Sequence, residues 1–166
     1  MKKLEVYTDG SVIQNPGQGG YGAIILHENG PIELSAGYTL TTNNRMEFLA
    51  VITALETVID MGESNRPIRV VSDSQYVVNS ISNEWFINWF RKETFKKANK
   101  DLWVRFNKIY SVLNLEMKWV RGHTGIRWNE HADVLAEKAA RNSSLHADDT
   151  GYLNILREQE MQLGMF

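Results

Sequence analysis

Leu4-Glu5-Val6-Tyr7-Thr8-Asp9-Gly10-Ser11, close to the N-terminus, decides how the first part of this chain is expected to fold. Apolar and polar residues alternate over residues 3–8, a pattern typical of a β-strand with one buried face. Asp9 ends this strand, and Gly10 begins a turn. A carboxylate at the end of a buried strand is costly unless a cation or hydrogen bonds compensate its charge. The stretch therefore predicts a strand and, at Asp9, a site where a cation or hydrogen bonds compensate the carboxylate.

Two more strands are expected immediately after this one. Residues 15–20 are rich in Gly, Asn and Pro, which indicates a turn, and residues 21–26 read as a second strand. Residues 28–31 predict a hairpin turn before a third strand at residues 32–40. Three strands joined by short turns predict an antiparallel meander.

The hydrophobic period then becomes helical. Asn44-Arg45-Met46-Glu47 is similar to a capping box, with Asn44 as the N-cap residue and Glu47 at the third helical position. Gly62 is expected to end this helix. Beyond it we expect strands at residues 68–72 and 115–120, and helices at residues 74–81, 85–90, 101–113 and 129–141.

A meander followed by alternating strands and helices predicts an α/β fold. We expect a five-stranded mixed sheet, with the antiparallel meander plus two parallel strands, flanked by helices. The length of 166 residues suits one domain, which we place at residues 1–142. Residues 143–166 are more polar, and we expect a loosely attached, partly ordered tail.

The amino-acid composition limits the class of protein and its expected cellular location. Apolar residues make up 43% of the chain and charged residues 23%, as is ordinary for a globular protein. The absence of cysteine excludes disulfides and thiolate zinc sites, and it fits a reducing, cytoplasmic location. No long apolar run follows Lys2 and Lys3 or occurs elsewhere, so we expect no signal peptide, no membrane span and no membrane partner.

The charge is unevenly distributed along the chain. Residues 85–108 contain seven basic and two acidic residues, a net charge of +5, which leaves −7 on the remainder of a chain of net charge −2. Such polarisation predicts that one region holds a polyanion and another holds cations.

Four carboxylates occupy positions where burial is expected. Asp9 and Asp73 end strands, whereas Glu47 and Asp133 lie beside the apolar stripes of two helices. Each alone has a simpler interpretation: turn residue for Asp9, capping box for Glu47, helix N-cap for Asp73 and exposed charge for Asp133. One divalent metal site would explain all four together.

Seven strings occur in chain order around these acids: Tyr7-Thr8-Asp9-Gly10-Ser11, Asn15-Pro16-Gly17, Gly19-Gly20-Tyr21-Gly22-Ala23, Thr41-Thr42-Asn43-Asn44-Arg45-Met46-Glu47, Ser72-Asp73-Ser74-Gln75-Tyr76-Val77, Val120-Arg121-Gly122-His123-Thr124-Gly125 and Asn129-Glu130-His131-Ala132-Asp133-Val134-Leu135-Ala136. The ordered combination resembles the bacterial-type (type 1) ribonuclease H family over residues 3–142. The resemblance implies a ribonuclease H-like fold.

The same resemblance implies a function for each acid. It implies endonucleolytic hydrolysis of the RNA strand of an RNA–DNA hybrid with two Mg²⁺ ions, for which Mn²⁺ is the candidate substitute, leaving 5′-phosphate and 3′-hydroxyl ends. Asp9 would bridge both ions, Glu47 and Asp73 would complete one coordination shell, and Asp133 would help to hold the other. His123, in a glycine-flanked loop, would assist in proton transfer or product release.

Candidate substrate contacts adjoin the catalytic strings. Only the 2′-hydroxyls of one strand distinguish a hybrid from duplex DNA or RNA, and polar side chains at the minor groove can read them. By resemblance these side chains are those of Asn15, Asn43, Asn44 and Gln75, although turn and cap roles are the alternative. Thr42 and Arg45 are the candidates for phosphate contacts.

The basic region supplies a second set of candidates. By resemblance, Trp85, Trp89, Lys96 and Lys97 belong to a protrusion that grips the DNA strand. The alternative is a pair of amphipathic helices with buried aromatic residues and solvated lysines. We expect a monomeric enzyme; a hybrid-binding module without catalysis and a resolvase-like nuclease of the same fold are the other hypotheses.

Overall fold

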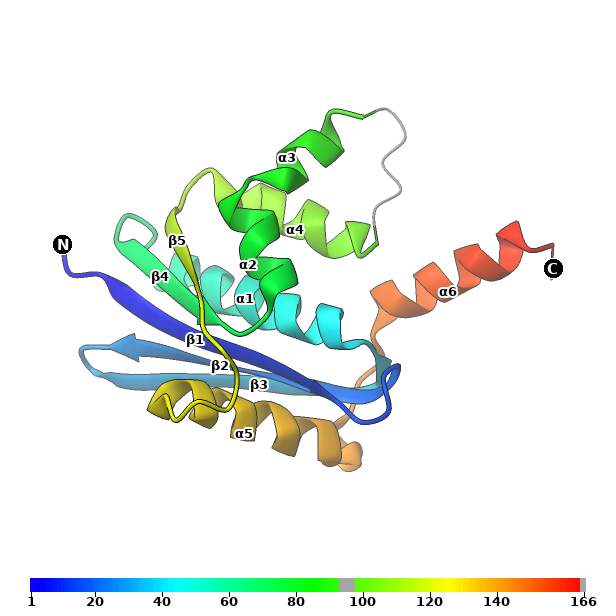
Figure 1. The fold of residues 1–166 in the computed structure, drawn as a ribbon, viewed down its shortest axis with the longest axis horizontal. Coiled ribbons are helices and arrows are strands. Elements are labelled where there is room, and N and C mark those ends of the chain that lie inside the picture. The colour runs from blue at the N-terminus through cyan, green and yellow to red at the C-terminus, as the bar shows by residue number, and fades with distance from the viewer. Residues whose placement is uncertain (93–97, 165–166) are drawn as a thin grey trace.

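The computed structural model describes residues 1–92 and 98–164. Its centre is a five-stranded sheet in the order β3-β2-β1-β4-β5 (Figure 1). The strands are β1 (Leu4–Val12), β2 (Gly17–His27), β3 (Gly30–Thr41), β4 (Pro67–Ser72) and β5 (Asn114–Trp119). β1, β2 and β3 pair antiparallel, while β4 pairs parallel with both β1 and β5. The predicted fold class is therefore confirmed.

The register of β1 and β4 brings two of the acids to one edge of the sheet. The last pair between these parallel strands is Tyr7 with Val71. Asp9 and Asp73 each follow two residues later in the chain. Because parallel strands run in the same direction, both carboxylates lie just beyond the same end of the β1–β4 pairing, although β1 itself continues to Val12 against β2.

Helices cover both faces of the sheet. Figure 1 shows α1, α2, α3 and α4 on one side and α5 on the other. The helices are α1 (Asn43–Asp60), α2 (Gln75–Ser82), α3 (Trp85–Phe90), α4 (Lys100–Tyr110), α5 (Arg127–Arg141) and α6 (Thr150–Gln162), with a 3₁₀ turn at Ser143–Leu145. The core between α1, α3 and α4 is aromatic: Trp103 lies 4.1 Å from Phe48 and 5.6 Å from Phe86 between ring centroids. Among the described residues, no helix has the length and apolar character needed to cross a bilayer.

The start of α1 differs from the prediction. Thr42, not Asn44, is the N-cap residue, and its side-chain oxygen accepts a hydrogen bond from the Arg45 N–H at 3.3 Å. Asn44 therefore lies inside the first turn, and Glu47 is not the reciprocal member of a capping box. Because the Glu47 carboxylate does not cap the helix, it can face the sheet.

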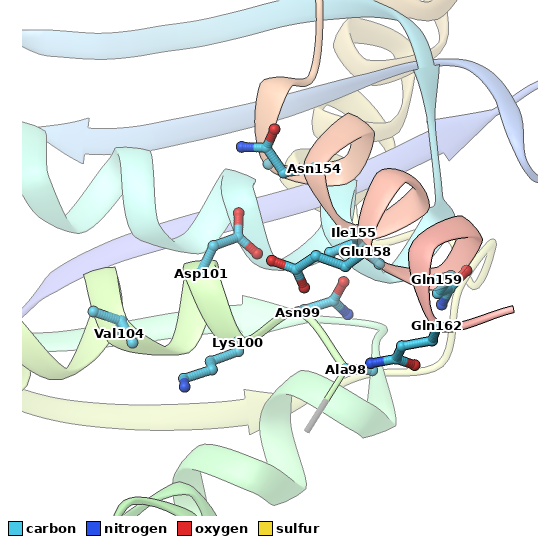
Figure 2. Close-up of a pocket in the computed structure, with 11 residues that line it drawn as sticks. Ala98, Asn99, Lys100, Asp101, Val104, Asn154, Ile155, Glu158, Gln159 and Gln162 are labelled. Carbon is cyan, nitrogen blue, oxygen red and sulfur yellow. The ribbon is translucent and has the colours of Figure 1, made fainter. Parts of the chain in front are cut away.

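The expectation of a loosely attached tail is wrong for residues 143–149. Ala147 pairs with Tyr38 of β3, and the Thr39 N–H donates to the Ala147 carbonyl at 3.0 Å. Asp149 is buried, because it lies against Arg45 and Thr41. α6 has no buried residue, and its C-terminal end projects from the domain (Figure 1). Side chains of α6, among them Asn154 and Glu158, line a pocket with the start of α4 (Figure 2).

Candidate active site

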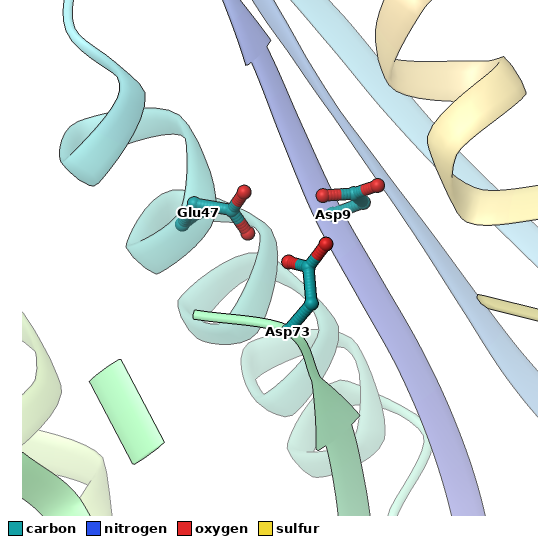
Figure 3. Close-up of side chains that lie close together, drawn as sticks. All are labelled: Asp9, Glu47 and Asp73. Atoms are coloured by element: carbon teal, nitrogen blue, oxygen red, sulfur yellow. The ribbon is translucent and has the colours of Figure 1, made fainter. Parts of the chain in front are cut away.

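Three carboxylates from distant parts of the chain converge around Asp9. The prediction that Asp9 ends its strand is wrong, because β1 continues to Val12 in its pairing with β2. Asp9 comes from β1, Glu47 from α1, and Asp73 from the residue after β4. One oxygen from each lies within 4.8 Å of the other two. Figure 3 shows the three side chains pointing toward one another. The structure thus brings together three of the four predicted metal ligands.

Gly10 explains how α1 comes close enough to Asp9. A Cβ atom at this position would lie 2.6 Å from the backbone nitrogen of Glu47 and 2.8 Å from the carbonyl carbon of Met46. Any side chain larger than hydrogen would push α1 away from β1. The Gly10 N–H also donates to the Asp9 carboxylate at 2.9 Å, which fixes the orientation of that carboxylate.

The cluster carries negative charge without a compensating ion pair. Burial and, after it, the neighbouring Asp73 together raise the pKa of Asp9 to about 8. Burial, with Asp9 and Asp73, also raises the pKa of Glu47 well above its usual range. Burial and Asp133 raise the pKa of Asp73. Within the described residues, no arginine, lysine or histidine forms a salt bridge with these three.

A divalent cation fits this arrangement. Glu47 Oε2 is buried and has no hydrogen-bond partner, so a cation would satisfy an oxygen that the chain itself leaves unpaired. A hard cation such as Mg²⁺ prefers carboxylate oxygens and would also relieve the mutual repulsion that raises the three pKa values.

Asp133 and His123 lie beside the triad rather than inside it. Asp133 is on α5, and its charge raises the pKa of both Asp9 and Asp73. His123 follows β5 with a positive φ of 57°, and its side chain is 82% exposed. Its Nδ1 is 3.9 Å from Asp133 Oδ2. Asp133 is positioned by the close packing of α5 against β2. This packing needs a glycine at position 22, because a Cβ atom there would lie 2.5 Å from the Ala132 carbonyl oxygen.

The RNase H family model matches residues 1–141. The chain belongs to the ribonuclease H family. It is 43% identical over 155 residues to the ribonuclease H of Pseudoalteromonas atlantica, covering 90% of this chain and 97% of that one. It is 44% identical over 157 residues to the ribonuclease H of Pectobacterium atrosepticum, covering 91% and 97%. The prediction of a type 1 ribonuclease H, a nuclease of the hydrolase class, is confirmed.

Solved structures agree with this assignment. LC9-RNase H1, a type 1 RNase H with the type 2 active-site motif, superimposes with a TM-score of 0.72 at 27% identity, covering 83% of this chain and 72% of that one. LC11-RNase H1, solved in complex with an RNA/DNA hybrid, gives a TM-score of 0.67 at 25% identity, covering 84% and 98%.

In this ribonuclease H, the polar residues predicted to read the hybrid surround the start of α1. Asn15 Oδ1 accepts a hydrogen bond from the Asn43 N–H at 3.1 Å, which ties the β1–β2 turn to the helix. Asn15, Asn43 and Asn44 are exposed, and so is Gln75, the first residue of α2. Thr42 is half-buried as the N-cap.

Arg45 does not fit the prediction of a phosphate contact. Its side chain is 3% exposed, and its guanidinium is taken by two carboxylates. Nη2 lies 2.7 Å from Asp101 Oδ2, and Nε lies 2.8 Å from Asp149 Oδ2. Because both partners saturate the buried guanidinium, Arg45 has a structural function and is removed from the substrate-binding set.

Trp85 and Trp89, the two aromatic residues predicted to contact nucleic acid, differ in how exposed they are. Trp85 is 47% exposed, as a nucleic-acid contact requires. Trp89 is half-buried and packs edge-on against Trp103 with ring centroids 5.1 Å apart, so it is less accessible than Trp85. Lys96 and Lys97 lie outside the described residues.

Sequence reasoning missed two groups of residues. Asp101 and Asp149 compensate Arg45, and Trp119 and Gly122 contact Asp73. Gly122 was visible within the string at residues 120–125, but only as a flank of His123. No pattern in the sequence marked Trp119, Asp101 or Asp149.

Proposed function

We propose that this chain hydrolyses the RNA strand of RNA–DNA hybrids endonucleolytically, with two divalent cations, and leaves 5′-phosphate and 3′-hydroxyl ends. Mg²⁺ is the proposed cofactor, and Mn²⁺ is the proposed substitute. The observation that carries the proposal is the convergence of Asp9, Glu47 and Asp73 without an ion pair, in a chain of the ribonuclease H family.

The four acids would divide the cations between them. Asp9 interacts with each of the other three acids and would contribute ligand oxygens to both cations. Glu47 and Asp73 would complete one site, and Asp133, whose charge already acts on Asp9, would support the other. When bound, the cations would supply the positive charge that activates the attacking water and stabilises the departing 3′ oxygen.

His123 is suited to moving a proton rather than holding a cation. Its imidazole extends from a loop into solvent, and its Nδ1 faces the Asp133 carboxylate at 3.9 Å. Histidine changes protonation near neutral pH, and we propose that it delivers a proton to the departing 3′ oxygen or aids product release.

Recognition of the hybrid would come from both sides of the acidic site. Asn15, Asn43, Asn44 and Gln75 would read 2′-hydroxyls, and Thr42 would contact a phosphate. The structural neighbour LC11-RNase H1 binds an RNA/DNA hybrid, which supports this substrate class. Trp85 would stack on the DNA strand, with Lys96 and Lys97 as predicted phosphate contacts. The monomeric state and the cytoplasmic location remain predictions.

The test is cleavage of a hybrid whose RNA strand is end-labelled, by the wild-type protein and by Asp9→Asn. We expect Mg²⁺-dependent cleavage of the RNA strand by the wild type, products with 5′-phosphate and 3′-hydroxyl ends, and no turnover by the variant. Duplex DNA and duplex RNA of the same sequence are the controls. Equal cleavage of duplex DNA would favour a resolvase-like nuclease, and no RNA cleavage at any metal concentration would refute the proposal.

A further inference from the structure

Trp119 holds the backbone on which the Asp73 carboxylate is mounted. Strand pairing between β4 and β5 ends with Ser72 opposite Trp119, so Asp73 lies one residue beyond the regular sheet. The indole Nε1–H of Trp119 donates to the Asp73 carbonyl oxygen at 3.0 Å. The indole thereby extends the attachment of β4 to β5 by one residue, onto the residue that carries a metal ligand.

Trp119 is not a core residue. Its side chain is 43% exposed, in contrast to Trp103, which is fully buried in the aromatic core. Phenylalanine at this position would keep an aromatic ring for packing but would have no N–H donor. The contact with Asp73 is therefore the feature of Trp119 that a change to phenylalanine would remove.

Gly122 lies close to the carboxylate group at the end of the Asp73 side chain. A Cβ atom at this position would lie 2.7 Å from Asp73 Oδ2 and 3.6 Å from its Cγ. Gly122 is not among the glycines with positive φ, so alanine is compatible with its backbone. The atom that an added methyl group would displace is the carboxylate oxygen, because the oxygen is at the free end of a side chain.

The turn around Asp73 is held independently from its other side. The Ser74 N–H donates to Ser72 Oγ at 3.1 Å, and Ser74 Oγ accepts from the Val77 N–H at 3.2 Å as the cap of α2. These bonds keep the strand-to-helix turn formed without Trp119. Loss of the indole contact should thus loosen the position of Asp73 without unfolding α2.

We propose that Trp119 and Gly122 are positioning residues for Asp73, and that the end of β5 and the segment after it set the cation affinity of the site. The inference rests on the proposed function, since it assumes that Asp73 ligates a cation. Neither residue would touch the substrate or the reacting atoms. Mg²⁺ tolerates little deviation from octahedral geometry, so a displaced ligand oxygen should weaken binding directly.

The experiment compares Trp119→Phe and Gly122→Ala with two control variants. Trp128→Phe changes an aromatic ring on α5 that contacts Arg127 and His131, and Thr124→Ala removes a hydrogen bond within the same loop, from Thr124 Oγ1 to the Arg121 carbonyl at 2.7 Å. Mg²⁺ is titrated into each folded protein without substrate, and binding is followed through the backbone amide resonances around Asp73. Hybrid cleavage is then measured across Mg²⁺ concentrations.

We expect Trp119→Phe to bind Mg²⁺ about threefold to tenfold more weakly, the size of one hydrogen bond. Gly122→Ala should weaken binding about tenfold or more, since small misplacements of a catalytic group are costly. In both, the Mg²⁺ concentration for half-maximal cleavage should rise by a similar factor, with KM for the hybrid unchanged. The controls should match the wild type.

Wild-type Mg²⁺ affinity in both variants would overturn the inference, including when their thermal stability falls, because a purely structural function predicts lost stability alone. Failure of the proposed function looks different: the wild-type protein itself would bind no Mg²⁺ or cleave no hybrid.

Discussion

Two clusters of carboxylates flank the first turns of α1. They differ in whether a positive charge from the chain compensates the buried carboxylates. In the Arg45 cluster (Arg45, Asp101 and Asp149), one guanidinium binds two carboxylates at 2.7 and 2.8 Å. In the acidic triad (Asp9, Glu47 and Asp73), three carboxylates meet without a cation from the described part of the chain. Arg45 and Glu47 are two residues apart, about 200° around the helix, so α1 serves both clusters at once.

The pKa values record this difference. Burial alone would raise the pKa of Asp149, but hydrogen bonds from Arg45 and Thr41 outweigh it and lower that pKa. In the triad, burial and neighbouring negative charges act in the same direction, and the pKa values of all three acids rise. A charge cluster that the chain balances stabilises the fold, whereas one that it leaves unbalanced indicates an external cation.

The largest expected effect comes from Asp9→Asn. Turnover should fall at least about a thousandfold, roughly 4 kcal/mol in the activation barrier, because the ligand shared by both cation sites loses its charge. The free energy of unfolding of the metal-free protein should rise by about 2 kcal/mol, since one of three repelling carboxylates is neutralised. Steady-state kinetics and urea denaturation in EDTA measure the two quantities. A variant that is both inactive and less stable would contradict this account of the triad.

The second prediction contrasts the partners of Arg45. Asp149→Asn should lower the free energy of unfolding by about 3 kcal/mol, because the buried guanidinium loses a buried partner. Asp101→Asn should cost less than about 1 kcal/mol, since the Asp101 side chain is 39% exposed and water can replace it. Urea denaturation of both variants tests this order. Equal losses would show that burial does not decide the strength of these pairs.

The third prediction concerns pH and has opposite signs in the two clusters. Asp9 has a folded-state pKa of about 8 against an ordinary value of 3.8, so the folded metal-free protein retains a proton that the unfolded chain loses. The stability due to this group is present below pH 3.8 and is lost as pH rises toward about 8. Asp149, with a lowered pKa, stabilises above its ordinary value of 3.8 and loses that contribution only in stronger acid.

Denaturation in EDTA between pH 4 and 8 should therefore show stability falling as pH rises, by up to about 5 kcal/mol. Asp9→Asn should have a flatter profile, and it serves as the control for other titrating groups. A wild-type profile that rises over this range would mean that the triad is not strained by its own charge.

The smallest expected effect comes from His123→Ala. Turnover should fall about tenfold to hundredfold, as for loss of an assisting proton donor, with the hybrid KM and the stability unchanged. The side chain is 82% exposed, so its removal costs no packing. His131→Ala is the matched control, because His131 pairs with Glu33 outside the triad and its loss should leave turnover within about twofold. Equal kinetics for the two variants would remove His123 from the mechanism.

Much of the fold could be predicted because its signals are local. Alternation marks the strands of the meander, and Asp9 and Asp73 meet because each lies two residues past the last β1–β4 pair. The predicted end of β1 at Asp9 is wrong, because pairing with β2 carries the strand on to Val12. The boundary of α1 was misplaced by two residues because Thr42, Asn43 and Asn44 are all competent caps, and only the backbone geometry selects Thr42.

The remaining errors share a physical cause. Arg45 looked like a phosphate contact, and the tail looked loose, because the pair that links them joins residues 104 positions apart. Trp119 and Asp73 are 46 positions apart and carry no periodic signal. Long-range partners of single charged or aromatic residues cannot be inferred from one sequence, whereas periodic patterns and ordered strings can.

The most direct test of the central claim is the Mg²⁺ dependence of the free energy of unfolding of the wild-type protein at neutral pH. If the triad is a cation site left unbalanced by the chain, stability should rise with Mg²⁺ concentration, by about 2.7 kcal/mol at one hundred times the dissociation constant, and the rise should be lost in Asp9→Asn but retained in Asp101→Asn. A wild-type stability that does not change with Mg²⁺, or that changes equally in Asp9→Asn, would contradict the claim.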